Sequence, residues 1–165
     1  MDTFAAMALA SIPPSNDVMN EKPRKTDDFI ITRAMRKNIL GVAFCFLVIL
    51  MTLIVIIKQM PANEVGAALT QFFTIFVMLQ FWNLFNASVF GTDHSVFKDS
   101  RHALGMVSVA IIILIGQILI VEFGGKVFRT EPMDLMTWIY IIAGTSIVFW
   151  AGEIYRLIKR MQKKK

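Results

Sequence analysis

Three amide side chains recur at a fixed interval inside one apolar stretch of this chain. Gln80, Asn83 and Asn86 are spaced by three residues, so on a helix they form a drifting stripe within about 120° of the circumference. An amide in an apolar medium needs a hydrogen-bonding partner, so we expect the stripe to face protein. We interpret it as hydrogen-bonding contact between helices. Direct contact with a transported ion is the alternative.

Asp2 is the second candidate for chemistry, because it lies near the start of a run of good helix formers. Residues Met1–Ser11 are predicted to form a short helix, and Pro13 and Pro14 are predicted to end it, since proline cannot continue a helix. The carboxylate is either an ordinary charge near a chain terminus, which composition alone favours, or a ligand within a membrane.

The remaining titratable residues give weaker signals. His94 and His102 share a loop with other polar residues, and their spacing fits solvated side chains better than a compact metal motif. Cys45 is the only cysteine, which excludes a disulfide or zinc–thiolate framework. Glu153 is expected at a membrane interface beside Arg156.

Four apolar stretches position these residues, and each is long enough to cross a bilayer. They cover residues 38–57, 68–90, 104–121 and 135–152. A helix rises about 1.5 Å per residue, so about 20 residues span the hydrocarbon core. Backbone groups in lipid must be satisfied within each helix. We therefore predict an all-α, polytopic membrane helix bundle with four transmembrane helices and a short N-terminal helical stub.

The basic residues predict the orientation of this bundle. Of the 17 Lys and Arg residues, 14 lie before the first stretch, between the second and third, or after the fourth, and 3 lie in the other two connections. The positive-inside rule then places both termini, and the loop between the second and third stretches, in the cytoplasm. The basic tail is interpreted as contact with the lipid bilayer and not with nucleic acid. Trp82, Trp138 and Tyr155 are expected to contribute to an aromatic belt.

Several strings follow one another in a fixed order along the chain. They are Met1–Ser11 with Pro13-Pro14, Arg36–Gly41, Phe81–Ala87, Gln117–Lys126 and Trp150–Glu153. They resemble the end of helix six, the start of helix seven, helix eight, the segment after helix nine and the end of helix ten in P-type calcium pumps. The resemblance is closest to the plasma-membrane and bacterial type, and it covers essentially the whole chain. It implies that the protein lies in a cell (plasma or inner) membrane.

The resemblance implies a domain organisation. Residues 1–11 would be a remnant of helix six, 12–37 a cytoplasmic connecting loop, 38–155 the four-helix C-terminal membrane domain and 156–165 a basic cytoplasmic tail. The Asp-Lys-Thr-Gly and Thr-Gly-Glu-Ser motifs and the ATP-binding domain of these pumps are absent from the sequence. We expect a fragment, begun at an internal methionine, with no cofactor of its own. Calcium transport, ATP and Mg²⁺ would belong to the full-length parent, and the partner would be the missing N-terminal part. An autonomous four-span protein that binds or regulates a partner membrane protein is the alternative.

The resemblance also implies roles for particular residues. Asp2 matches an aspartate that coordinates calcium, and would do so only with the rest of the pump, because calcium requires six to eight oxygens. We expect the isolated chain to bind calcium no better than millimolar. Gln80 stands where two-ion pumps carry a glutamate, which predicts one calcium per ATP in the parent.

The connecting loop carries the last of the predicted functional residues. In the resembling pumps this loop helps couple phosphorylation to helix movement. Pro13 and Pro14 would fix its exit angle, and Asp27 and Asp28 would pair with the phosphorylation domain. A solvated linker is the alternative interpretation.

Overall fold

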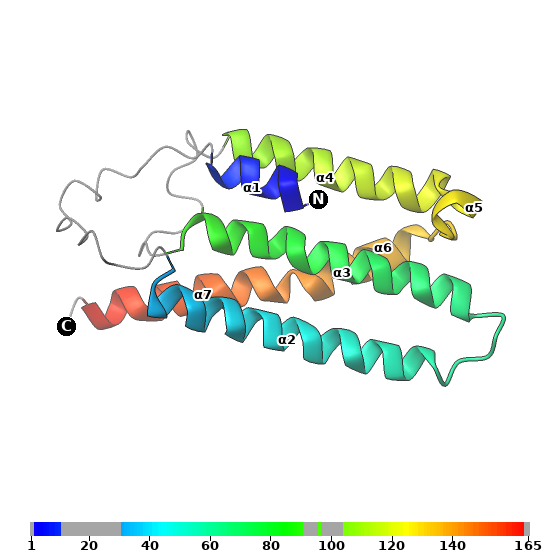
Figure 1. Ribbon diagram of the computed structural model, residues 1–165, viewed down its shortest axis with the longest axis horizontal. Coiled ribbons are helices and arrows are strands. Elements are labelled where there is room, and N and C mark those ends of the chain that lie inside the picture. The colour runs from blue at the N-terminus through cyan, green and yellow to red at the C-terminus, as the bar shows by residue number, and fades with distance from the viewer. Residues whose placement is uncertain (1, 11–30, 91–95, 97–103, 164–165) are drawn as a thin grey trace.

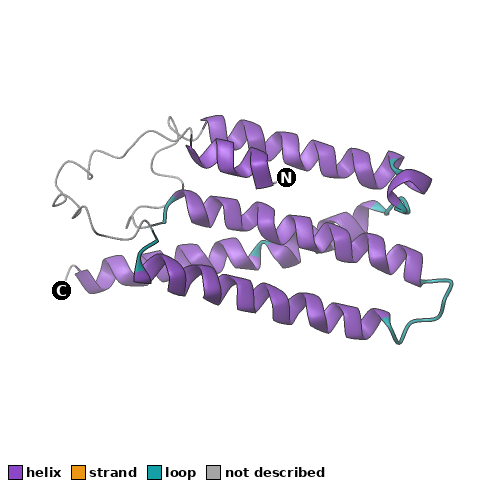
Figure 2. Ribbon diagram, in the orientation of Figure 1, coloured by secondary structure: helices purple, strands orange, loops and turns teal. Residues whose placement is uncertain are grey.

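The computed structural model describes residues 2–10, 31–90, 96 and 104–163, and within these residues every regular element is a helix (Figures 1 and 2). The helices are α1 (Asp2–Ala10), α2 (Arg33–Ile57), α3 (Val65–Ser88), α4 (Leu104–Phe123), α5 (Gly125–Phe128), α6 (Leu135–Thr145) and α7 (Ile147–Lys163). Four segments are long and apolar enough to cross a membrane: α2, α3, α4 and the combined α6 and α7. The predicted helix bundle with four spans and an N-terminal helix is confirmed.

The first span begins earlier than its apolar stretch. Thr32 caps α2 by accepting a hydrogen bond from the Met35 amide at 3.2 Å, an interaction that satisfies one of the free N–H groups of a first turn. Residues 33–37, which the domain prediction placed in the connecting loop, are therefore the first turns of α2. Residues 11–30 lie outside the described part of the chain.

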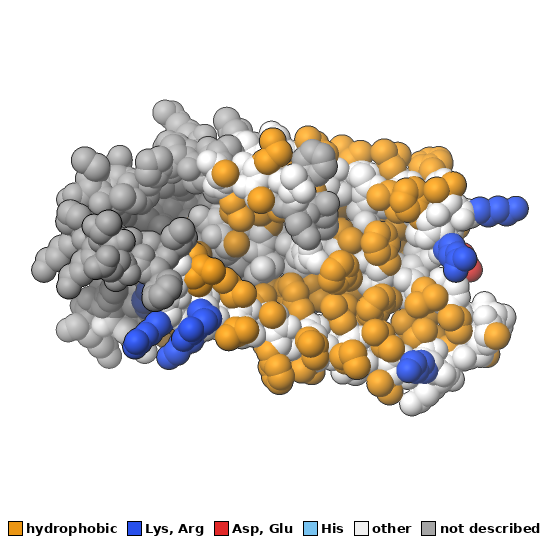
Figure 3. Space-filling view, in the orientation of Figure 1, with side chains coloured by type: hydrophobic (Ala, Val, Ile, Leu, Met, Phe, Trp, Pro, Cys, Tyr) orange, Lys and Arg blue, Asp and Glu red, His pale blue; other side chains and the backbone are white. Residues whose placement is uncertain are grey.

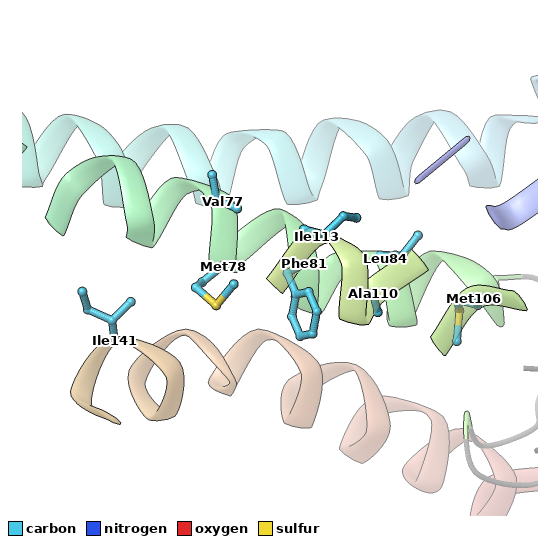
Figure 4. Close-up of a cluster of buried hydrophobic side chains, with 8 residues drawn as sticks. All are labelled: Val77, Met78, Phe81, Leu84, Met106, Ala110, Ile113 and Ile141. Atoms are coloured by element: carbon cyan, nitrogen blue, oxygen red, sulfur yellow. The ribbon is translucent and has the colours of Figure 1, made fainter. Parts of the chain in front are cut away.

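α3 is the central helix of the bundle. It contacts α1, α2, α4, α6 and α7, whereas α2 contacts only α3 among the described elements. The buried core lies along α3 and joins it to α4 and α6 (Figure 4). Its members are Val77, Met78, Phe81, Leu84, Met106, Ala110, Ile113 and Ile141.

The fourth span is interrupted at Ser146, which separates α6 from α7. The hydroxyl of Thr145 donates to the Ile141 carbonyl at 2.6 Å, and the hydroxyl of Ser146 donates to the Ala143 carbonyl at 2.7 Å. Such bonds from serine and threonine to their own helix commonly bend it. After the break α7 continues to Lys163, so most of the predicted tail 156–165 is helical.

The connection between α4 and α6 is a compact reversal that contains α5. Gly124 is required by packing, because a Cβ there would overlap the carbonyl oxygen of Ile120. Gly125 has φ 42°, a conformation that favours glycine. The Thr130 hydroxyl donates back to the same Ile120 carbonyl at 2.9 Å and closes the reversal.

The surface is that of a membrane protein. Hydrophobic side chains cover the middle of the visible face, and Lys and Arg lie toward its two ends (Figure 3). α2 illustrates this best, because none of its most apolar window is buried. Consecutive side chains such as Leu47, Val48 and Ile49 are exposed around its circumference, as expected of a helix that contacts lipid.

Candidate functional site

Asp2 is the first residue of α1, the nine-residue helix that packs against α4 and α3. Ala5 and Leu9 anchor α1 by packing against the buried core. Within the described residues there is no cluster of three or more His, Cys, Asp or Glu side chains that could hold a metal ion. The role of Asp2 as a calcium ligand therefore stays a prediction.

The predicted amide stripe divides into two parts in the structure. Asn86, in the last turn of α3, makes two hydrogen bonds to α7. Gln80 and Asn83 are half-buried, and neither side chain has a hydrogen-bond partner among the described residues. The three amides lie on the same helix, but α7 reaches only the last of them.

Asn86 lies in a notch on α7 that a missing side chain creates. Its Nδ2 donates to the Val148 carbonyl at 2.9 Å, and its Oδ1 accepts from Nη2 of Arg156 at 2.9 Å. A Cβ on Gly152 would overlap the amide oxygen and lie 2.7 Å from the amide carbon. The same Nη2 lies 2.8 Å from Oε1 of Glu153, as expected for these two residues. The Phe81–Ala87 and Trp150–Glu153 strings therefore meet at this point.

The cluster of Asn86, Gly152, Glu153 and Arg156, which we call the Asn86 cluster, extends to the loop between α3 and α4. The backbone N–H of Val96 donates to Oε1 of Glu153 at 3.2 Å. One carboxylate oxygen thus joins that loop to the Arg156 guanidinium. Because both charged side chains are largely buried, their hydrogen bonds are less screened by water than a surface pair would be. The arrangement joins α3, α7 and the loop at one end of the bundle.

The side chain of Trp82 makes contacts within the bundle that the sequence did not predict. Its indole N–H donates to the Thr145 hydroxyl at 3.1 Å, immediately before the break in the fourth span. Its ring also packs against Phe149, with ring centroids 5.8 Å apart. Since Asn86 binds Val148 after the break, α3 holds the fourth span on both sides of Ser146.

Trp138 is also buried and hydrogen-bonded within the bundle. Its Nε1 donates to Oε1 of Glu122 at 3.0 Å, and the Met133 amide donates to the same oxygen at 3.4 Å. Glu122 therefore joins the end of α4 to the start of α6 at the opposite end of the bundle from the Asn86 cluster. Tyr155 is exposed, so its side chain is free to contact the membrane interface, and its place in an aromatic belt stays a prediction.

Two threonines form a hydrogen-bonded ladder that sequence reasoning missed. Thr70 and Thr74 are buried, and each donates its hydroxyl to the carbonyl four residues earlier in α3. Thr74 then accepts from Nε2 of the buried Gln117 on α4 at 3.3 Å, and Thr70 accepts from the Glu131 amide at 3.0 Å. A threonine hydroxyl in a helix can donate to a carbonyl of its own helix. The sequence positions of Thr70 and Thr74 therefore did not predict a partner on another element.

The residues predicted for the coupling loop lie outside the described part of the chain. They are Pro13, Pro14, Asp27 and Asp28, and the loop residues His94 and His102 lie outside it as well. Their predicted roles stay predictions.

Comparison with known proteins gives a consistent family. Residues 1–158 match the family described as cation transporting ATPase, C-terminus. The chain is 34% identical to plasma membrane calcium-transporting ATPase 2 of Oreochromis mossambicus, in an alignment that covers 93% of the chain and 15% of that protein. It is 31% identical to the human plasma membrane calcium-transporting ATPase 4, over 99% of the chain and 14% of that protein.

A relative outside the animals agrees. The calcium-transporting ATPase PAT1 of Dictyostelium discoideum is 32% identical over 96% of the chain and 15% of its own length. The chain thus spans about one seventh of the length of these relatives, and the match to them is nearly complete along the chain. The chain is a multi-pass membrane protein that belongs to the cation transporting ATPase C-terminal family.

Proposed function

We propose that this chain forms the C-terminal membrane helices of an ATP-driven calcium pump of the cell membrane and supports the ion pathway there. One observation carries the proposal: calcium-transporting ATPases match 93–99% of the chain in single alignments. The alternative of an autonomous regulatory protein has no comparable support. ATP and Mg²⁺ would act on parts of the pump outside the matched region, and the chain alone would be inactive.

Asp2 is the residue through which the chain would contact the transported ion. Calcium takes six to eight oxygen ligands, with carboxylates prominent among them. One carboxylate cannot complete such a shell, so the other ligands would come from helices of the pump outside this chain. The packing of α1 on α4 and α3 would hold the aspartate in place.

A chimeric pump tests both statements. In the Dictyostelium relative, the C-terminal region that aligns with this chain is replaced by the chain, and ATP-dependent calcium uptake is measured in membrane vesicles. We expect uptake that exceeds that of the relative truncated before this region. We expect Asp2→Asn to abolish calcium-dependent phosphorylation, while the matched control Asp134→Asn, at the other end of the bundle, leaves it intact.

Two outcomes would contradict the proposal separately. A chimera that is inserted in the membrane at normal levels but takes up no calcium would refute the assignment as a pump domain. Calcium activation that survives Asp2→Asn would refute the role of Asp2 and leave the assignment standing.

A further inference from the structure

The reversal around α5 presents a group of large apolar side chains to its surroundings. Phe123 is 81% exposed, Val127 84% and Phe128 58%, and the first two are the most exposed large hydrophobic side chains in the described part of the chain. An exposed apolar patch of this kind marks a contact surface. Together with Lys126 and Arg129, which lie on the same turn, we call these residues the α5 corner.

The acidic side chains of this region are turned to the protein. Glu122 accepts hydrogen bonds from an indole and a backbone N–H. The carboxylate of Glu131 lies against the start of α3, where a Cβ on Gly66 would overlap it. Asp134 caps α6. All three carboxylates between the end of α4 and the start of α6 therefore lie against groups of this chain.

The two basic side chains of the α5 corner have no such contact. Lys126 and Arg129 are exposed, and neither forms a hydrogen bond or an ion pair with another described residue. They flank Val127 and Phe128 in the sequence, so one turn carries both cations and large apolar groups. This combination is typical of a surface at the boundary between acyl chains and phosphate headgroups.

The length of α4 places the α5 corner at that boundary. α4 has 20 residues and ends at Phe123, so it is about 30 Å long, which is the thickness of the hydrocarbon core. α5 lies directly beyond that end (Figure 1). Ile115, Leu119 and Phe123 follow one another at intervals of four residues, and all three are exposed. The apolar part of the corner thus continues a row on the lipid-facing side of α4.

We propose that the α5 corner is a phospholipid-binding surface. Its three apolar side chains contact the acyl chains next to the headgroups, and Lys126 and Arg129 bind lipid phosphate groups. The positive-inside rule assigns this contact to the outer leaflet. The corner is preformed, because the bond from the Thr130 hydroxyl to the Ile120 carbonyl closes the reversal. The proposal requires only that the chain spans a bilayer, so it does not rest on the proposed function.

Fluorescence quenching in phosphatidylcholine nanodiscs tests the contact with lipid. In a Cys45→Ser background, Val127→Cys is labelled with the fluorophore NBD. The matched control is Asn63→Cys, an exposed position in the connection between α2 and α3 at the same end of the bundle. One quencher is a phosphatidylcholine with a nitroxide on the acyl chain close to the headgroup, and the other is iodide in water. We expect the nitroxide lipid to quench the Val127→Cys probe and iodide to quench the Asn63→Cys probe.

Two results would overturn the proposal. Strong quenching of the Val127→Cys probe by iodide, equal to that of the control, would place the corner in water. Protection of the Val127→Cys probe from both quenchers would assign the corner to a contact between copies of the chain. Neither result would bear on calcium transport, which the chimeric pump tests separately.

A charge variant gives an independent readout of phosphate binding. Lys126→Gln with Arg129→Gln removes both cations. We expect a lower midpoint of thermal unfolding in phosphatidylcholine nanodiscs and an unchanged midpoint in dodecyl maltoside, a detergent without phosphate. The control Lys126→Arg with Arg129→Lys keeps both charges and should match the unchanged chain in both media. An equal fall in nanodiscs and detergent, or no fall in nanodiscs, would contradict a role of these side chains in binding phosphate.

Discussion

Gly152 shows how one residue fixes the contact between α3 and α7. The Asn86 amide occupies the space of its missing side chain and is held there by Val148 and Arg156. Gly152→Ala would push the amide away and break both hydrogen bonds. Overpacking of this kind typically costs about 1–3 kcal/mol. We expect a lower midpoint of thermal unfolding in detergent, measured by circular dichroism.

A second glycine provides the matched control for this prediction. Gly116 lies in α4, and a Cβ there would meet no atom within 4 Å. Because alanine is the better helix former, Gly116→Ala should leave the midpoint unchanged or raise it. Equal midpoints for Gly152→Ala and the unchanged chain would show that the notch is not required for packing.

Asp134 stabilises the start of α6 as its N-cap. Its carboxylate accepts hydrogen bonds from the Thr137 hydroxyl and from the Thr137 backbone N–H, and these bonds hold its pKa below the usual value of 3.8. Both bonds favour the charged form. The cap is therefore fully present at neutral pH and is lost as the pH falls through the lowered pKa.

This dependence can be measured with a variant that keeps the cap. Asparagine is also a favoured N-cap residue, but it does not titrate. As the pH is lowered from neutral to below the usual aspartate pKa of 3.8, we expect the unfolding midpoint to fall further in the unchanged chain than in Asp134→Asn. Parallel pH profiles would show that the charge of Asp134 makes no contribution.

The elements of this fold were largely predictable, and the contacts between them were not. The four spans could be predicted from hydropathy, because a backbone in lipid must satisfy its polar groups internally and a helix does so. The break at Ser146 was missed, although the adjacent hydroxyls of Thr145 and Ser146 were the available signal. Polar contacts were harder to predict. The three amides of the stripe look alike in the sequence, but only Asn86 contacts α7, where it meets Gly152. The hydrogen-bond acceptors of Trp82 and Trp138 could not be predicted either, because the fold alone brings Thr145 and Glu122 next to these indoles.

At the scale of the whole molecule, the two ends of the bundle differ in charge. Four helix ends lie together at one end of the bundle (Figure 1): the start of α2, the end of α3, the start of α4 and the end of α7. Arg33, Arg36 and Lys37 belong to that end, as does the basic final part of α7. The opposite end carries Lys58, Lys126 and Arg129 together with acidic residues that include Glu131 and Asp134. The positive-inside rule therefore predicts that the first of these ends faces the cytoplasm.

Two glutamines at opposite ends allow a direct test of this orientation. In a Cys45→Ser background, Gln59→Cys places a thiol in the connection after α2, and Gln162→Cys places one near the end of α7. Both positions are exposed. We expect a membrane-impermeant maleimide to label Gln59→Cys in intact cells and Gln162→Cys only after permeabilisation. The reverse pattern would contradict the prediction. It would also put the segment between α1 and α2 on the side away from cytosolic ATP, where it could not couple phosphorylation to helix movement.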